Sequence, residues 1–548
     1  MHRSTDIGSS WEVIGPDLTR NDPGKLGPSG GPVTRDNTGA EVYCTIFCLV
    51  ESPHERGVLW AGSDDGLVHL SRDAGASWQN ITPGPDVLPE WALISIIELS
   101  PHDASTAYVA ATRYKLDDTR PYLLKTSDFG ESWTRITSGV PDHEFTRVIR
   151  EDPNRRGLLY AGTETGLYVS FDDGRHWEPM KGNLPVAPVY DMVIKGVEMV
   201  VASHGRSFWI LDDLTPLHQL RDELIGAPHH LFQPRPAVRL HVGVRRFADE
   251  PRPGLVNYTR TDTSVVSFMP RKEGRHYLDA GESPPVGVRI QYYVRDRPEG
   301  ALKLEVLSAD GGTVLRSYSS EQQPGQPRLP TESGINRFVW NMRLPGAPRI
   351  VDEKLDPWQR DDGPMVLSGA YQVRLTVDGQ SLTQPFEIVP DPRLSVTPDD
   401  LRQQFDMLQV LLDKIGTANR LINRIGALQK QVEAWRSWTA DHAQASAIRE
   451  AAQPLETELA ALVDTLIDVH YPEAQLYAVG LQEKLNALFE FVDSASYAPA
   501  QQSRQVLDEL APRLDAALAR FEREVVPRVN ALNDAIRGAG LGPVAGGT

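Results

Sequence analysis

Short apolar runs alternate with turn residues along the first 213 positions of the chain. Each run has the length of a β-strand and is too short for a typical helix, and Gly, Asp or Asn follows most of them. The runs fall into consecutive groups that predict four short antiparallel strands apiece, and the last group lacks its fourth strand. The four groups occupy residues 41–83, 90–138, 143–182 and 186–213.

The hydrophobic pattern changes twice after residue 213. Residues 214–285 are rich in Pro and Arg and predict an irregular connector with a few strands. Residues 286–390 alternate with a period of two, which predicts a β-sandwich. Residues 391–537 carry single-sided apolar stripes at helical spacing, which predict an antiparallel helical bundle that begins at a Thr397 N-cap. The Gly-rich tail, residues 538–548, is predicted to be disordered.

One motif, [Ser/Thr]-x-Asp-x-Gly-x-x-Trp, recurs four times in the first region. The Asp side chain and the hydroxyl two residues before it can accept hydrogen bonds from the backbone N–H groups of a tight turn, and the Gly supplies a positive φ. We expect the Trp to pack its apolar face under the turn and to start the next strand. The motif is therefore predicted to be structural. Its copies are Ser4, Asp6, Gly8 and Trp11; Ser71, Asp73, Gly75 and Trp78; Thr126, Asp128, Gly130 and Trp133; and Ser170, Asp172, Gly174 and Trp177.

At these residues the chain resembles the Asp-box (BNR-repeat) β-propeller proteins, which include sortilin-type ectodomains, sialidases and xyloglucanases. Repeats of about 45 residues with four strands each are typical of propeller blades. The resemblance implies an Asp-box β-propeller at 1–213, an immunoglobulin-like or fibronectin type III-like sandwich after it, and an extracellular or periplasmic location. The first box begins at residue 4, so either an N-terminal strand completes the last blade or further blades precede it. We favour the second interpretation, in which the chain corresponds to the C-terminal half of such a protein.

Composition limits the classes of partner. The net charge of −18 disfavours nucleic acid and anionic membranes, and the chain lacks an apolar run of membrane-spanning length. The only cysteines, Cys44 and Cys48, lie on one predicted strand too far apart for a disulfide, so we expect buried free thiols. We find no His/Cys metal cluster, no phosphate loop and no nucleophile elbow, and we expect neither a metal nor a cofactor.

Glycoside hydrolysis, which the resemblance suggests, requires two carboxylates with opposed protonation states. Adjacent acids occur at 64–65, 117–118, 172–173 and 212–213, but the turns and strand ends that contain them explain most of these acids. A sialidase Phe/Tyr-Arg-Ile-Pro motif is absent. We therefore assign no catalytic residue.

Two loops are candidates for ligand binding. The first interrupts one strand group with Arg113, Tyr114, Asp117, Asp118 and Arg120, and the second carries His204 and Arg206. A solvated insertion and a structural histidine are the simpler interpretations of the two loops. Residues 15–40 form a long Gly/Pro-rich connection that is either a lid or a disordered linker.

These observations predict a binding protein that recognises a protein or glycan partner on the propeller without catalysis. The alternatives are a glycoside hydrolase with catalytic acids partly on preceding blades, and an assembly or scaffolding factor.

Overall fold

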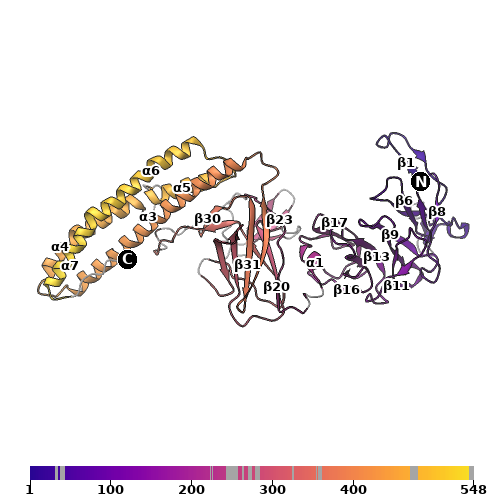
Figure 1. Ribbon diagram of the computed structural model, residues 1–548, viewed down its shortest axis with the longest axis horizontal. Helices are drawn as coiled ribbons and strands as arrows, with labels where there is room; N and C mark the ends of the chain where they lie inside the picture. Colours follow the sequence, from indigo (N-terminus) through magenta and orange to yellow (C-terminus); the bar gives the residue numbers. More distant parts are fainter. Residues whose placement is uncertain are drawn as a thin grey trace. The chain divides into compact units, whose positions relative to one another are not determined.

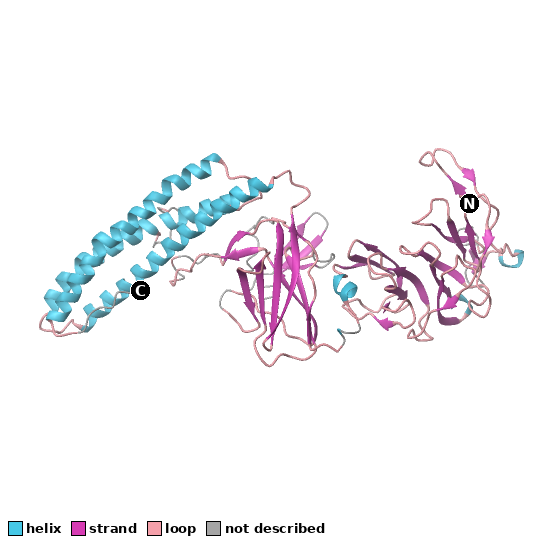
Figure 2. Cartoon of the chain, in the orientation of Figure 1, coloured by secondary structure: helices cyan, strands magenta, loops and turns pink. Residues whose placement is uncertain are grey.

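The structure is a computed structural model that describes residues 1–541 apart from 31–34, 37–42, 222–223, 225, 242–256, 262–263, 269–274, 278–283, 324–325, 353–354, 356–360 and 469–478. The chain divides into two compact units, Met1–Leu220 and Arg221–Thr548. The first is formed mainly by strands, and the second combines strands with long helices (Figures 1 and 2).

Consecutive antiparallel sheets, which we call meanders, build the first unit. The first three meanders have four strands and the fourth has three, each hydrogen-bonded in chain order. Their strands are β5 (Ile46–Glu51), β6 (Leu59–Ser63), β7 (Val68–Ser71) and β8 (Gln79–Asn80); β9 (Leu93–Leu99), β10 (Ala107–Arg113), β11 (Asp118–Thr126) and β12 (Thr134–Arg135); β13 (Thr146–Glu151), β14 (Leu159–Thr163), β15 (Leu167–Ser170) and β16 (Glu178–Pro179); and β17 (Val189–Lys195), β18 (Glu198–Ser203) and β19 (Phe208–Leu211).

Close packing of neighbouring meanders explains the small residues of their second strands. A Cβ at Gly62 on β6 would lie 2.5 Å from Ile94 Cγ2 of the next meander, and a Cβ at Gly162 on β14 would lie 2.6 Å from Val189 Cγ1. Apolar clusters span each of these junctions. The core of the first unit therefore lies between successive sheets.

The N-terminal hairpin, β1 (His2–Arg3) and β2 (Glu12–Val13), forms a separate two-stranded sheet. β19 pairs with β18 and not with the hairpin, so the structure does not show an N-terminal strand completing the last meander. The outer face of β5 carries exposed apolar side chains. Leu49 is 47% exposed, whereas Ile97 and Ile149, which hold the same register in the next two meanders, are 1% and 0% exposed.

The sandwich in the second unit begins earlier in the chain than the sequence predicts. β20 (His229–Leu231) pairs with β25 (Val288–Val294), and β21 (Ala237–Val238) pairs with β32 (Gln380–Val389). Strands this short leave no readable period, so residues 229–238 of the predicted connector are part of the sandwich. The other strands of these two sheets are β26 (Lys303–Ser308), β27 (Val314–Ser319), β28 (Gly334–Trp340) and β31 (Gly369–Val377).

The remaining described strands of the second unit form two small sheets. They are β22 (Asn257–Thr261), β23 (Ser264–Phe268) and β24 (Arg275–Tyr277), and β29 (Arg343–Pro345) with β30 (Asp362–Met365). A short helix, α1 (Thr215–Gln219), closes the first unit. Much of the rest of the predicted connector lies outside the described residues.

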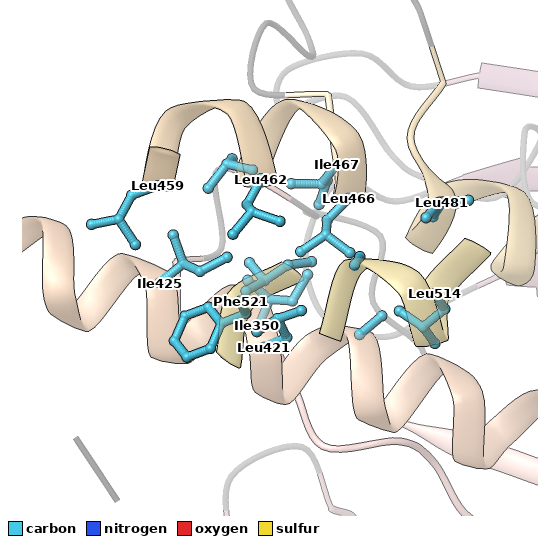
Figure 3. Close-up of a cluster of buried hydrophobic side chains, with 14 of the residues drawn as sticks. Ile350, Leu421, Ile425, Leu459, Leu462, Leu466, Ile467, Leu481, Leu514 and Phe521 are labelled. Carbon is cyan, nitrogen blue, oxygen red and sulfur yellow. The ribbon is translucent and has the colours of Figure 1, made fainter. Parts of the chain in front are cut away.

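A helical bundle completes the second unit, and its first helix begins at the predicted Thr397 cap. Thr397 Oγ1 accepts from Asp400 N, and Asp400 Oδ2 accepts from Thr397 N, each at 3.1 Å, a reciprocal capping box. Side chains from all parts of the bundle meet in one core, including Leu421, Leu459 and Phe521 (Figure 3). The helices are α3 (Pro398–Trp438), α4 (Ala445–Leu466), α5 (Leu481–Val492), α6 (Gln501–Arg520), the π-helix η3 (Phe521–Val525) and α7 (Val526–Gly538).

Buried polar contacts join the sandwich to the bundle. Arg343 Nη1 lies 2.8 Å from Asp493 Oδ2, and both side chains are nearly enclosed. Arg239 Nη1 donates to Ser496 Oγ at 3.0 Å, and the His241 ring bonds the Asp493 carbonyl. Of the predicted tail, α7 covers the start, and residues 542–548 lie outside the described range. Within the described parts of the chain, no helix has the length and apolar composition to cross a membrane.

Candidate functional site

The four Asp-x-Gly boxes form the same turn. Asp73 Oδ1 accepts from Ser77 N at 2.8 Å and from the Ser71 hydroxyl at 2.9 Å, and Gly75 N donates to Ser71 Oγ at 2.9 Å. The other copies repeat these bonds with Asp6, Asp128 and Asp172. Hydrogen bonds from serine lower the pKa of Asp6 and Asp128 to about 2.

The box tryptophans differ from the expectation that they all pack under their own turn. Trp11 and Trp78 donate to the carbonyls of Gly8 and Gly75 in their own boxes. Trp133 and Trp177 instead donate to the carbonyls of Ile81 and Ile136 in the preceding meander, at 2.9 and 2.6 Å. Half of the boxes therefore also fasten one meander to the next.

The boxes share one end of the meanders with the turns between first and second strands. Ala74 N donates to Gly57 O at 2.9 Å, and Asp173 N donates to Gly157 O at 2.9 Å. In an antiparallel meander the turns between second and third strands lie at the opposite end. We call that opposite end the turn face; it comprises residues 64–67, 114–117, 164–166 and 204–207 with the segments that enter each first strand.

Equivalent hydrogen bonds fix three of the four turns on this face. Asp64 N donates to Thr45 O at 3.0 Å, Glu164 N to Phe145 O at 3.2 Å, and His204 N to Pro188 O at 2.8 Å. Asp64, Glu164 and His204 therefore occupy corresponding positions in three meanders.

In the second meander the turn contains a 3₁₀ helix, and both strands that flank it are longer than their counterparts in the other two meanders with boxes. Arg113 ends β10, a 3₁₀ helix, η2 (Tyr114–Leu116), follows, and Asp117 adopts a left-handed φ of 56°. Asp118 and Arg120 belong to β11, so the predicted loop is shorter than expected. Polar residues on extended strand ends look like a loop in sequence, because they lack the apolar alternation of a buried strand.

Asp118 is the centre of an ion-pair network. It accepts from Arg113 Nη1 at 2.8 Å, from Arg120 Nε at 2.9 Å and from the Tyr122 hydroxyl at 2.6 Å, and its side chain is 10% exposed. The hydrogen bond from Arg120 is the largest of the effects that hold the pKa of Asp118 well below its usual range. Asp118 therefore remains ionised at neutral pH and has no proton to donate.

An aromatic–arginine cluster connects the two predicted binding loops. The Tyr114 ring stacks on Phe145, with centroids 4.9 Å apart, and the Tyr190 ring stacks on His204, also at 4.9 Å. The Arg147 guanidinium lies 5.3, 4.9 and 4.1 Å from the centroids of Tyr114, Phe145 and Tyr190. One cation thus joins rings contributed by three meanders.

Glu164 completes this cluster, because its Oε2 accepts from Arg147 Nε at 2.8 Å. Phe145, Arg147, Glu164 and Tyr190 were not predicted as site residues. The sequence carries no clear signal for them, because the strand of Arg147 also contains Thr146, Arg150 and Glu151. Arg206 is exposed in the same turn as His204, and its carbonyl accepts from Trp209 Nε1 at 2.8 Å.

The other adjacent acids have structural partners. Asp64 accepts from Thr45 N at 2.8 Å, Asp65 from Arg20 N at 2.6 Å, and Asp173 from the Tyr108 hydroxyl at 2.7 Å. Asp213 accepts from Thr215 N at 3.1 Å, at the start of α1. In the described ranges no group of three or more His, Cys, Asp or Glu side chains could hold a metal ion.

The cysteine prediction is confirmed in part. Both thiols are free, but they are half-buried rather than buried. Cys44 precedes β5 with a φ of 64° and is not on the strand with Cys48. Burial raises the pKa of the Cys48 thiol to about 12.

Comparisons with known proteins give structural likenesses only. No family model matches the chain, and no curated protein matches its sequence. An ancestral GH74 enzyme is 12% identical with a TM-score of 0.30, over 70% of this chain and 43% of that one. YCF48 bound to D1 peptide is 12% identical with a TM-score of 0.23, over 62% and 84%.

A third solved structure, PorZ of the type-IX secretion system of Porphyromonas gingivalis, is 13% identical with a TM-score of 0.26, over 65% of this chain and 47% of that chain. The chain thus spans less than half the length of PorZ and of the GH74 enzyme.

Proposed function

We propose that the first unit is a set of Asp-box β-propeller blades whose turn face binds a protein partner without catalysis. The observation that carries this proposal is the contact of Arg147 with the rings of Tyr114, Phe145 and Tyr190. We also propose that the sandwich of the second unit is immunoglobulin-like.

The composition of the cluster favours a protein ligand. Tyrosine and arginine are enriched among the residues that dominate the energetics of protein interfaces: tyrosine supplies a large contact area with few rotatable bonds, and arginine supplies several directional donors. Tyr190 is 45% exposed and His204 is exposed, so a partner can reach the outer end of the stack. Arg147 is largely enclosed and paired with Glu164, which holds the rings in place before a partner arrives.

The state of the acids argues against glycoside hydrolysis on this face. Hydrolysis needs one protonated and one ionised carboxyl group on either side of the bond. Asp118 is ionised and already accepts hydrogen bonds from two arginines and a tyrosine, so it fits neither the role of general acid nor that of a free nucleophile.

The test is capture of partners on the immobilised chain, with extracts and a glycan array examined in parallel. Tyr190→Ser removes the exposed outer ring, and Phe208→Ser on β19 removes another exposed ring outside the cluster. We expect the wild-type chain and Phe208→Ser to capture at least one protein that Tyr190→Ser does not capture. Equal retention by all three chains would overturn the proposal. Glycan binding that depends on Tyr190 would replace the protein partner with a carbohydrate.

A further inference from the structure

A second aromatic group on the turn face lies beside a segment that we call the strap, residues 16–28. Arg20 fastens the strap to the first meander: its backbone N donates to Asp65 Oδ2 at 2.6 Å, and its Nε donates to the Asp65 carbonyl at 2.9 Å. Leu18 is buried, and the other described strap residues are exposed or half-buried. The strap is part of the long connection predicted at residues 15–40, and it contains one 3₁₀ turn, η1 (Pro23–Lys25).

The strap places two cations beside one tryptophan. The Arg20 guanidinium carbon lies 4.8 Å from the Trp91 ring centroid, and Lys25 Nζ lies 4.5 Å from it. Tyr43 stacks against Trp91 with centroids 6.0 Å apart. Glu90 Oε1 is 3.5 Å from Arg20 Nη1. The Arg20 guanidinium thus contacts the Trp91 ring, which stacks on Tyr43, together with the Glu90 carboxylate and the Asp65 backbone carbonyl.

The backbone of Trp91 is held in an unfavourable conformation. Its φ is 65°, a left-handed value that bulky residues rarely adopt. Gly66 makes this approach possible, because a Cβ there would lie 3.2 Å from Trp91 N. Residues with backbone strain persist only where the surrounding structure holds them in place, and they cluster at functional sites such as ligand clamps.

We propose that Tyr43, Glu90, Asp65 and Trp91 form a binding site for a guanidinium group, which Arg20 fills from within the chain. An arginine of the protein partner takes the place of Arg20 when the strap opens. Guanidinium fits better than ammonium, because it is planar, stacks on aromatic faces and donates several hydrogen bonds at once. Lys25 supplies a second cation that keeps the site filled.

The strap is suited to opening. Its contacts with the first meander include one buried leucine, the Asp65 and Glu90 contacts of Arg20 and the cation–ring contacts, and segments with few buried contacts open at low free-energy cost. This inference rests on the proposed function in one respect: the protein partner binds the turn face, which also carries the Arg147 cluster. The residues involved are different, so the two proposals fail separately.

The experiment measures binding of the fluorescein-labelled peptide Gly-Arg-Gly-Arg-Gly by anisotropy. Arg20→Gln with Lys25→Gln empties the site, and we expect an affinity at least tenfold above that of wild type. Arg513→Gln with Arg523→Gln, two exposed arginines of the bundle, makes the same change in net charge. We expect the peptide affinity of that control to stay near the wild-type value. Adding Trp91→Leu to the Arg20→Gln, Lys25→Gln variant should return its peptide affinity to about the wild-type value.

Three outcomes would overturn the proposal: no gain on emptying the site, an equal gain in the bundle control, or a gain that survives Trp91→Leu. If Trp91→Leu does not fold, Glu90→Gln serves instead and should weaken peptide binding severalfold. A peptide of the same length with lysine should bind more weakly than the arginine peptide. The two proposals can be told apart by their results. If the peptide binds as expected but Tyr190→Ser loses no partner, the guanidinium site is supported and the function proposed for the Arg147 cluster is rejected.

Discussion

The side chain of Ile81 lies directly against the α-carbon of Gly130, so that a Cβ at Gly130 would stand 2.6 Å from Ile81 Cδ1. Gly174 and Ile136 repeat the contact at 2.6 Å in the next junction. In each case an isoleucine that follows the fourth strand of one meander contacts the box glycine of the next. The glycine therefore has two roles, a left-handed turn conformation and a place for the neighbouring side chain.

Replacement of Gly130 by alanine should be more destabilising than its backbone conformation alone explains. A left-handed φ costs alanine about 1–2 kcal/mol, and the clash with Ile81 adds about 1–3 kcal/mol. Gly196→Ala is the matched control, because Gly196 also has a positive φ but a Cβ there would meet no heavy atom of the described residues within 4 Å. Urea unfolding followed by tryptophan fluorescence should show the difference; equal losses would mean that Ile81 simply moves away.

Glu98 should make stability depend on pH near neutrality. Burial raises its pKa to about 7 from 4.5, against the opposing effect of Arg150. A raised pKa in the folded state means that the contribution is complete below about pH 4.5 and is lost as pH rises through about 7.

Glu98→Gln should therefore remove this slope and make the protein more stable than wild type above pH 7, by up to about 3 kcal/mol. Urea midpoints at pH 5 to 8, compared between the two chains, provide the measurement. A slope that persists in Glu98→Gln would assign it to another group.

The Asp118 network predicts the result of hydrolase assays. We expect no release of reducing ends from polysaccharides or aryl glycosides by the chain, and no change with Asp118→Asn. The same substitution should lower the melting temperature, because Arg113 and Arg120 lose their ionised acceptor. Turnover that disappears in Asp118→Asn would place a catalytic site on β11.

Arg343 and Asp493 should hold the sandwich and the bundle in one cooperative unit. Asp493→Asn leaves a buried guanidinium without its charge partner, which costs about 3–5 kcal/mol. Replacing both residues by Met and Leu should restore much of that loss. Calorimetry should show one transition for the second unit in wild type and two in Asp493→Asn; a single unchanged transition would reject the coupling.

Local chemistry explains what could be predicted from the sequence. The box turns and the Thr397 cap depend on residues within four positions of one another, so their spacing alone specifies the hydrogen bonds. The Arg147 cluster was missed because it assembles rings from different meanders, and only the packing of the sheets brings Tyr114 and Tyr190 to the same cation.

The short strands β20 and β21 were missed for a related reason. They have three and two residues, and their membership of the sandwich depends on partners far along the chain. His204 was singled out by its turn, but its stacking on Tyr190 required a register that the sequence does not reveal.

The exposed face of Leu49 has a consequence for protein engineering. The junctions that join the first three meanders are made of the same parts, an isoleucine on the first strand and an isoleucine against a box glycine, and the β5 side exposes Leu49 at the position of the first of these parts. A designed meander with a matching aliphatic face could therefore be grafted ahead of β5. Such an extension would lengthen the array in the way that repeat proteins grow, by adding one nearest-neighbour interface at a time.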